Sequence, residues 1–531
     1  VHLSFLFRLR IRIRQPGPRI PGTILYFSSL NYNTQASNTN QAIWVGIGQL
    51  SSFFLSLLSA AILARYFNKS DYGTYKQVLY IYNTLLILFS AGLQGAYSYF
   101  LPRQSMEQGK DFIYKLIRTF LISGIFFSVT LFLSAPAIAV LFKNPDLQKG
   151  LRIFSAVPVL MLPVIGIEGI YATLRKTHVI AIYTTLSRVL MLLLITVPVL
   201  LLKGTYITAL YGWIIASLVT FLTGIYLILK PFVAVERKPT RFRYEDIFRY
   251  STPLMVATIY GIIIRFADQF FISRYYGAEV FAEFSNGFID LPFVAMIAGA
   301  TVTVLLPLFS RYSETSEGID SICQTWKSAT ERSIILVYPL LAFFIFNARN
   351  SVVALYGPQY EVSAVYFIIG MMIGYFNIIV FQSVLFALGK TRIYARIHLV
   401  QAVLIWIVGF IIVSLSGSPA TYAALSRIFY IAQVCVGIYY AARVLGVSLK
   451  YVIPFSTMLK VLLHSSAICG LVSFLTGLTD LNVFLSLGIS GLGSLLLIIL
   501  SGDLFGIHYR AVLASMLANA PGAGLLTGRG R

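Results

Sequence analysis

Five ionisable side chains lie inside long apolar stretches of this sequence: Glu168, Arg265, Asp268, Asp290 and Arg427. A charge at membrane depth costs about 3 kcal/mol or more, so each should face protein or a water-filled cavity. A guanidinium holds phosphate oxygens through two-point contacts and stays charged in a dry cavity, whereas a carboxylate can carry a proton or a cation. These residue types predict an anion site and an ion-coupling site.

The two arginines are the candidates for the anion site. At about 1.5 Å per residue, Arg265 and Arg427 lie on the order of 10 to 12 Å below the outer ends of their apolar stretches. We expect them, with Asp268 close by, to form a cationic lining. Four more arginines extend this lining toward the two membrane faces: Arg65, Arg274, Arg103 and Arg311. In the alternative interpretation, Arg265 pairs with Asp268 one turn later and Arg427 snorkels or caps carbonyl groups.

Two carboxylates are the candidates for ion coupling. Glu168 lies in VIGIEGIYATL without a basic residue nearby, and Asp290 lies in FIDLPF. Either can carry a coupling proton or sodium ion, and Glu168 can also bind substrate. The alternatives are a Glu168 carboxyl kept neutral by a neighbouring helix and an Asp290 carboxylate solvated at the outer end of a helix.

The composition shows which environment must hold these groups. Of the 531 residues, 58% are hydrophobic and 11% are charged, and the mean hydropathy is +0.80. Soluble domains carry about a quarter charged residues, so we predict an all-α polytopic membrane protein. With about 20 residues per span, its fourteen or so spans leave room only for short loops and not for a large catalytic domain. The three cysteines are far apart and predict neither disulfides nor a metal site.

The apolar stretches give the predicted positions of the transmembrane spans. They are residues 41–63, 77–99, 114–137, 152–173, 180–202, 206–229, 251–273, 287–309, 333–355, 364–387, 394–415, 420–442, 454–476 and 481–502. The loops after even-numbered spans hold 22 Lys and Arg residues and the other loops hold nine. The positive-inside bias therefore predicts that the even loops and both termini are cytoplasmic. It also accounts for the net charge of +22 without nucleic acid as a partner.

An internal repeat divides the chain into two halves. ARYFNKSDYGTY (64–75) aligns without gaps with SRYYGAEVFAEF (273–284), at an offset of 209 residues. Two six-helix lobes in parallel repeat follow, with a binding region at their interface. The predicted organisation is a disordered basic N-terminal arm (1–38), an N-lobe (39–229), a cytoplasmic connector (230–250), a C-lobe (251–447), a hairpin of spans 13 and 14 (448–505) and a C-terminal tail (506–531).

Four motifs in matching order carry a family resemblance. They are LARYFNKSDYGTY after span one, IIIRFADQFFISRYYGAEVFAEF through span seven, LYGPQYEVSA after span nine and LGKTR after span ten. Over about residues 40–505, the chain resembles the polysaccharide transporter family, the Wzx-type O-antigen and oligosaccharide-lipid flippases. This family belongs to the multidrug/oligosaccharidyl-lipid/polysaccharide flippase superfamily.

The resemblance implies a V-shaped pair of lobes that opens alternately to the two membrane faces. The implied activity is the transfer of an undecaprenyl-pyrophosphate-linked oligosaccharide across the bacterial cytoplasmic membrane for surface polysaccharide biosynthesis. Neither an enzymatic reaction nor a cofactor is expected. The expected partners are this substrate and membrane lipids. The basic loop RKPTRFR (237–243) is a candidate for binding anionic lipid or a polysaccharide assembly protein, although the positive-inside bias alone also explains it.

Polar side chains in the spans are candidates for binding sugar hydroxyls, or else for hydrogen bonds between helices. They are Gln49, Gln94, Asn377, Gln382, His398, Gln401 and Gln433. Two other functions compete with the flippase. A multidrug exporter of the same superfamily would need buried carboxylates in its lobes to exchange cations for ions, and span one has none. A membrane glycosyltransferase or polysaccharide polymerase would need a long outer loop, and the odd loops are short.

Overall fold

The computed structural model describes residues 38–90, 92–312, 318–415 and 417–518. Within these ranges all regular secondary structure is helical, and thirteen segments are long and apolar enough to cross a membrane. Helices are expected because hydrocarbon offers no water to satisfy free backbone N–H and C=O groups. The prediction of an all-α polytopic membrane protein is confirmed. Residues 1–37 of the predicted N-terminal arm and the last thirteen residues of the tail lie outside the described residues, and residue 38 begins the first helix.

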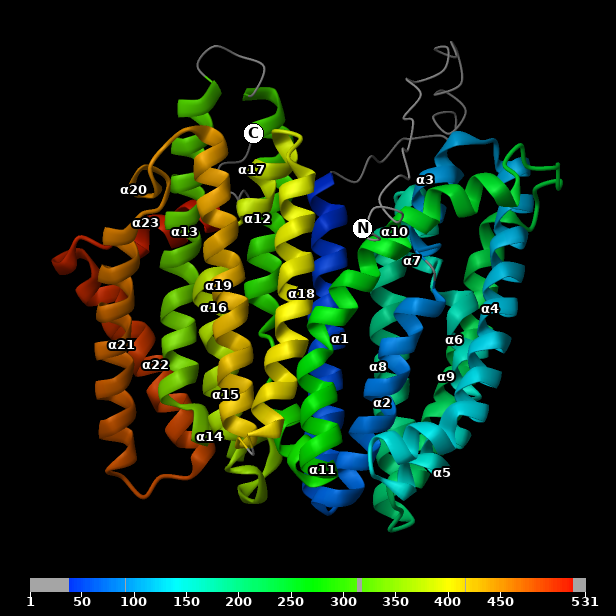
Figure 1. The fold of residues 1–531 in the computed structure, drawn as a ribbon, viewed down its shortest axis with the longest axis horizontal. Helices are drawn as coiled ribbons and strands as arrows, with labels where there is room; N and C mark the ends of the chain where they lie inside the picture. The colour runs from blue at the N-terminus through cyan, green and yellow to red at the C-terminus, as the bar shows by residue number, and fades with distance from the viewer. Residues whose placement is uncertain (1–37, 91, 313–317, 416, 519–531) are drawn as a thin grey trace, which may run out of the picture.

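The helices of the first half of the chain stand together in one group, which we call the N bundle (Figure 1). It contains α1 (Asn38–Tyr66), α2 (Lys69–Phe89), α3 (Gln94–Phe100), η1 (Leu101–Arg103), α4 (Met106–Leu141), α5 (Pro145–Phe154), α6 (Val157–Met161), η2 (Leu162–Val164), α7 (Ile167–Thr173), α8 (Thr177–Leu201), α9 (Tyr206–Leu229) and η3 (Lys230–Phe232). Residues 233–243 then lead to the second half. We call the end of the molecule with these residues, uppermost in Figure 1, the connector face.

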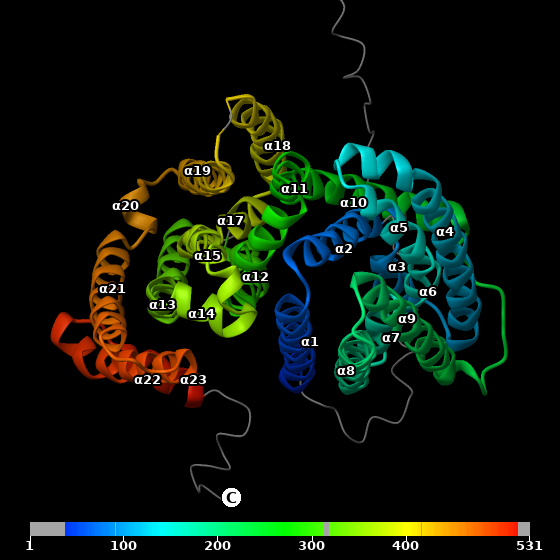
Figure 2. The ribbon, with the colours of Figure 1, turned by 90° about the horizontal axis from the view of Figure 1, so that it is seen from below.

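The helices of the second half form the C bundle. It contains α10 (Tyr244–Arg265), α11 (Ala267–Gly287), α12 (Pro292–Tyr312), α13 (Gly318–Phe346), α14 (Ala348–Tyr356), η4 (Pro358–Tyr360), α15 (Ser363–Met372), α16 (Gly374–Asn377), α17 (Phe381–Ala387), α18 (Thr391–Ser414) and α19 (Pro419–Leu445). Seen along the helices, the two bundles lie next to each other, with α1, α2 and α11 between them (Figure 2).

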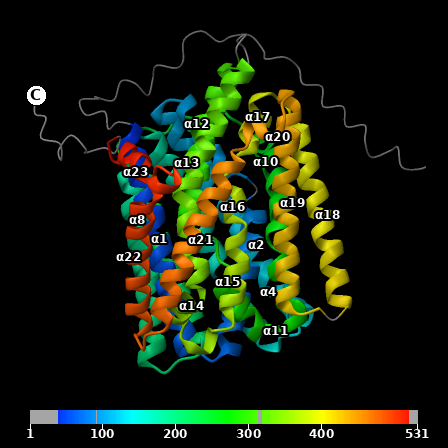
Figure 3. The ribbon, with the colours of Figure 1, turned by 90° about the vertical axis from the view of Figure 1, so that its left-hand side faces the viewer.

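The last helices cover the side of the C bundle that faces away from the N bundle (Figure 3). They are α20 (Leu449–Val452), α21 (Phe455–Gly477), α22 (Val483–Ser501), η5 (Gly502–Phe505) and α23 (Tyr509–Ala518). Helix α21 packs along α13, and α22 packs against α14. Asn350 of α14 donates a hydrogen bond to Ser486 of α22 at 3.2 Å. The predicted hairpin is thus attached to the C bundle.

The predicted seventh span, residues 251–273, is not one continuous apolar helix and is absent from the thirteen candidate spans. Helix α10 ends at Arg265, and α11 begins at Ala267. Charged residues on both sides of the break lower the apolar character of this region. The chain then bends inside α11 at Gly277, whose φ of 86° suits glycine because it has no Cβ.

The bend at Gly277 corresponds to the turn between α1 and α2. That turn is made by Asn68, whose side chain caps α2 by accepting a hydrogen bond from the Asp71 N–H at 2.8 Å. Gly277 lies 209 residues after Asn68, which is the offset of the sequence repeat. We call this end of the molecule, lowermost in Figure 1, the opposite face. From Gly277, residues 278–287 lead back into the molecule alongside α2.

Candidate functional site

Arg427 lies inside the C bundle. It is eight residues into α19, or about 12 Å from the opposite face, and only 9% of it is exposed. Its Nη2 atom is 3.7 Å from Oδ1 of Asp290, and its guanidinium lies 3.8 Å from the centre of the Phe288 ring. Its Nε atom is buried and finds no hydrogen-bond partner in the described part of the chain. The Arg427 side chain is therefore a desolvated cation whose Nε–H group is available to donate a hydrogen bond.

The alternative pairing of Arg265 with Asp268 is wrong for this structure. Asp268 is buried and accepts hydrogen bonds from Ser426 Oγ at 2.5 Å and Tyr422 Oη at 3.5 Å, both from α19. Arg265 is exposed at the end of α10, and its guanidinium makes neither a hydrogen bond nor an ion pair among the described residues.

Tyr430 contacts both Arg427 and the backbone next to Arg265. The Tyr430 ring centre lies 5.6 Å from the Arg427 guanidinium, and the Tyr430 hydroxyl donates to the carbonyl of Ile264 at 2.9 Å. Ile264 directly precedes Arg265. The structure thus brings Arg265, Asp268, Asp290 and Arg427 into one region of the C bundle.

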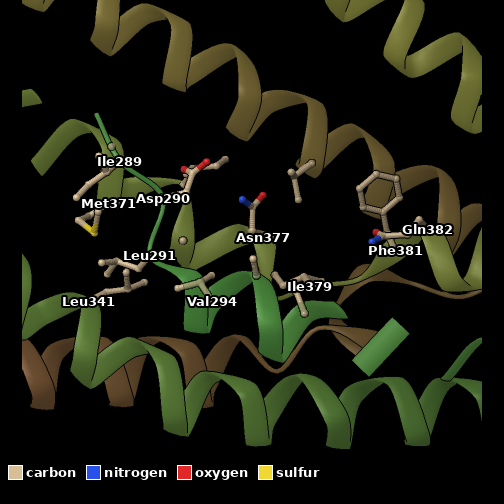
Figure 4. A pocket seen from close by; sticks show the side chains of 16 residues that line it. Ile289, Asp290, Leu291, Val294, Leu341, Met371, Asn377, Ile379, Phe381 and Gln382 are labelled. Atoms are coloured by element: carbon tan, nitrogen blue, oxygen red, sulfur yellow. The ribbon is translucent and has the colours of Figure 1, made fainter. Parts of the chain in front are cut away.

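Asp290 lies two residues before the first residue of α12 and is thus at a helix end, as the alternative interpretation expected, although this end lies within a crossing. It belongs to the break between α11 and α12, and residues 278–287 of α11 precede it within the same crossing. Its contact with Arg427 places it inside the bundle. Its carboxylate is 63% exposed and lines a cavity of about 260 Å³ (Figure 4). Irregular backbone at membrane depth is tolerated where it lines such a cavity.

The N bundle contains a larger cavity of about 890 Å³ between α1, α2, α3, α7 and α8. Glu168, exposed at the start of α7, and Arg188 of α8 both line it, together with Gln49 and Gln94. No carboxylate pairs with Arg188 among the described residues. The described residues also contain no group of three His, Cys, Asp or Glu side chains that could hold a metal ion.

Arg188 is the functional candidate that the sequence analysis missed. In the count of positive charges, each Lys and Arg was assigned to its nearest loop. Arg188 was therefore assigned to the loop before the fifth span. The helix begins at Thr177, so Arg188 is eleven residues inside it, or about 16 Å deep. The apolar residues on both sides of it, VLMLLL in particular, were the signal that could have identified it.

The predicted lining residues Arg65 and Arg274 lie near the opposite face. Arg65, near the end of α1, donates hydrogen bonds to the last carbonyls of α14, namely Val353, Ala354 and Leu355, at 2.7 to 3.2 Å. It therefore caps a helix of the other bundle. Arg274 lies over the Tyr275 ring at 5.2 Å, and its Nη1 atom is buried without a partner in the described residues.

Arg103 and Arg311 lie at the connector face and not in the interior. The Arg103 guanidinium lies 3.8 Å from the centre of the Tyr99 ring, and it donates a hydrogen bond to the Tyr99 carbonyl. Arg311 is exposed at the end of α12. The structure therefore separates these two arginines from Arg265 and Arg427, although all four were predicted to contribute to one lining.

Polar contacts join the two bundles near the opposite face. Lys69 forms an ion pair with Glu283 at 2.6 Å, with side chains 31% and 14% exposed. Two buried hydrogen bonds follow in the same region: Tyr72 Oη to Asn286 Oδ1 at 2.9 Å and Gln77 Nε2 to Ser273 Oγ at 2.9 Å. We call these three contacts, with the cap made by Arg65, the opposite-face seal.

Backbone packing at Gly73 is part of the same contact region. A Cβ atom at Gly73 of α2 would lie 1.9 Å from the carbonyl oxygen of Ala278 in α11. Glycine is thus required for α2 and α11 to approach this closely.

An exposed ion pair on the same face offers a contrast to Arg427. Arg349 Nε and Glu361 Oε1 are 2.6 Å apart, and the side chains are 69% and 50% exposed. The hydrogen bond from Arg349 lowers the pKa of the Glu361 carboxyl. Such exposed pairs contribute little to stability, so Arg349 is suited to control experiments.

Solved structures share this fold. A lipid II flippase, MurJ, in an inward closed conformation aligns with a TM-score of 0.65 at 18% sequence identity, over 87% of this chain and 99% of that one. An inward-facing multidrug resistance MATE family transporter of the MOP superfamily aligns with a TM-score of 0.55 at 14% identity, over 77% of this chain and 99% of that one.

Sequence comparisons identify the family. The succinoglycan biosynthesis transport protein ExoT of Rhizobium meliloti (strain 1021) is 24% identical over 336 residues, which are 61% of this chain and 63% of that protein. The family described as polysaccharide biosynthesis protein matches residues 39–313. The family resemblance drawn from the motifs is confirmed, and the chain belongs to this polysaccharide biosynthesis protein family.

Proposed function

We propose that this protein is a flippase for a polyprenyl-pyrophosphate-linked oligosaccharide in the bacterial cytoplasmic membrane. The observation that carries the proposal is Arg427, a buried guanidinium whose Nε has no partner among the described residues, in the same region of the C bundle as the exposed Arg265. A pyrophosphate needs such counter-charge to leave the membrane surface, and a guanidinium matches its oxygens. Arg188 supplies a further cation from the N bundle. The chain acts in this proposal as a transporter and not as an enzyme.

We propose alternating access as the mechanism. The lobes 39–229 and 251–447 move relative to each other about the connector 230–250, and the hairpin 448–505 moves with the C-lobe. The connector face and both termini are cytoplasmic, in agreement with the excess of Lys and Arg in the even loops. The opposite-face seal then closes the outer side while the substrate enters from the cytoplasm.

Depletion of the protein tests this function. Cells depleted of it should accumulate a complete lipid-linked oligosaccharide in the inner leaflet, where an added glycosidase cannot reach it in intact spheroplasts. The measurement is the amount of this lipid and its protection from the enzyme, compared with undepleted cells. Normal outward exposure, in cells that carry no second flippase, would contradict the proposal. A truncated glycan would indicate an enzyme instead.

Ion coupling through Glu168 and Asp290 is a second part of the proposal. Glu168 faces the N-bundle cavity without a partner among the described residues, so its carboxylate is open to a proton or a sodium ion. In proteoliposomes, Glu168→Gln should abolish the stimulation of flipping by an imposed gradient and leave the rate without a gradient unchanged. A wild-type rate that ignores the membrane potential and both ion gradients would exclude the coupling role of both carboxylates.

A further inference from the structure

The cavity beside Asp290 is built from two interrupted helices of the C bundle. One interruption is residues 288–291 between α11 and α12, and the other is residues 378–380 between α16 and α17. Asn377 is the fifteenth residue of a 25-residue crossing, and thus lies near the middle of the membrane. The resulting cavity has a volume of about 260 Å³, slightly below the ~300 Å³ at which ligand pockets usually begin.

Three polar side chains line this cavity in a row: Asp290, Asn377 and Gln382 (Figure 4). Asn377 is exposed and Gln382 is half-buried, and neither side chain makes a hydrogen bond within the described residues. Each carboxamide offers two donors and an acceptor. Free hydrogen-bonding groups at membrane depth are costly unless water or a ligand satisfies them.

The charge and shape of the cavity favour a neutral ligand that is rich in hydroxyl groups. Its one carboxylate lies 3.7 Å from the Arg427 guanidinium, so the pair carries no net charge. Carboxamides match hydroxyls, because both groups donate and accept hydrogen bonds. The remaining wall is apolar and includes Leu341 and the Phe381 ring, which suits the C–H face of a sugar ring.

We propose that this cavity is a subsite for one sugar ring of the transported glycan, bound by Asn377, Gln382 and the free oxygen positions of Asp290. The inference rests on the proposed function. Asp290 contacts Arg427 and lines the cavity at the same time. The subsite therefore adjoins the pyrophosphate-binding arginine, and the ring that it holds lies near the pyrophosphate end of the substrate.

Lipid binding by the full-length protein in nanodiscs tests the subsite. The probes are undecaprenyl pyrophosphate without sugar and the same lipid bearing glucose, galactose or N-acetylglucosamine. Wild type should bind at least one sugar-bearing lipid about tenfold more tightly than the sugar-free lipid, because two or three hydrogen bonds are added. The double variant Asn377→Leu, Gln382→Leu should lose this difference and keep its affinity for the sugar-free lipid.

Two further variants make the test specific. Asn377→Ser with Gln382→Ser keeps the cavity polar but shortens both side chains, and it should lose the difference as well. Gln324→Leu removes an exposed carboxamide from another cavity, between α12 and α13, and should leave all affinities unchanged. Equal wild-type affinity for all four lipids would overturn the subsite and leave the flippase proposal standing. Binding of none of them would overturn both.

Discussion

Arg427→Gln should reduce flipping of a pyrophosphate-linked lipid in proteoliposomes by about 100-fold. The variant removes charge-assisted hydrogen bonds worth about 1.5 to 3 kcal/mol each, and a tenfold change corresponds to about 1.4 kcal/mol. Arg427→Lys should recover only part of the rate, since an ammonium lacks the planar fork that matches two phosphate oxygens. The same ranking should appear in cells as the yield of surface polysaccharide at equal protein level.

Two controls separate binding from folding. Arg349→Gln removes an exposed guanidinium on the opposite face and should leave flipping unchanged. The double variant Arg427→Gln, Asp290→Asn removes both members of the ion pair. If Arg427 served only to neutralise Asp290, the double variant would flip normally, whereas a substrate-binding role predicts that it stays inactive. Normal flipping by Arg427→Gln itself would refute the cationic lining.

Gly73→Ala should open the opposite face and strongly reduce flipping. Alanine normally stabilises a helix relative to glycine by roughly 0.5–1 kcal/mol, but here its Cβ would overlap the Ala278 carbonyl. Helices α2 and α11 must then separate, at a cost of about 1–3 kcal/mol, so the closed state should become roughly 5- to 150-fold rarer. The variant tests whether close approach at Gly73 is needed for transport.

Cysteine labelling measures this opening. Cys323, Cys435 and Cys469 are replaced by serine, and Ser273→Cys is introduced at a fully buried position of the seal. A membrane-impermeant maleimide added outside should label this cysteine slowly in the parent and about tenfold faster with Gly73→Ala. Gly261→Ala is the matched control, because a Cβ there meets no atom within 4 Å. Equal labelling in all three proteins would show that Gly73 does not control the seal.

Most of the fold could be predicted from the sequence. Each spanning helix forms its backbone hydrogen bonds within itself, so it can be recognised as an apolar stretch without knowledge of its neighbours. The sequence also identified Asp268 and Arg427 as charges that are buried within the helices, since a charge within an apolar run has few explanations, and their role in binding stays a prediction. It failed at the seventh span, where Arg265 and Asp268 interrupt the helix. Which neighbour a buried charge meets depends on helix rotation and packing, so the partners Ser426 and Tyr422 of Asp268 could not be predicted.

The candidate site was less predictable because helix interruptions depend on tertiary packing. Asp290 was placed near the outer end of one uninterrupted span, although Gly287 and Pro292 flank it and indicate a break in the crossing. The interruption at 378–380 contains neither proline nor glycine, and Gly374, three residues before Asn377, begins the short helix α16 instead of marking this break. Arg188 was missed for a different reason. Each charge was counted with its nearest loop, so a charge in the middle of a span was assigned to a loop at its end.

The free energy needed to break the opposite-face seal is small enough for the seal to open and close reversibly. It consists of two buried hydrogen bonds, one ion pair and the cap made by Arg65. At about 0.5–1.5 kcal/mol net for each such contact, breaking all four costs on the order of 2–6 kcal/mol. One elementary charge crossing a potential of 100 mV releases about 2.3 kcal/mol. One to three charges per cycle therefore carry enough energy to open the seal, and thermal motion alone rarely does.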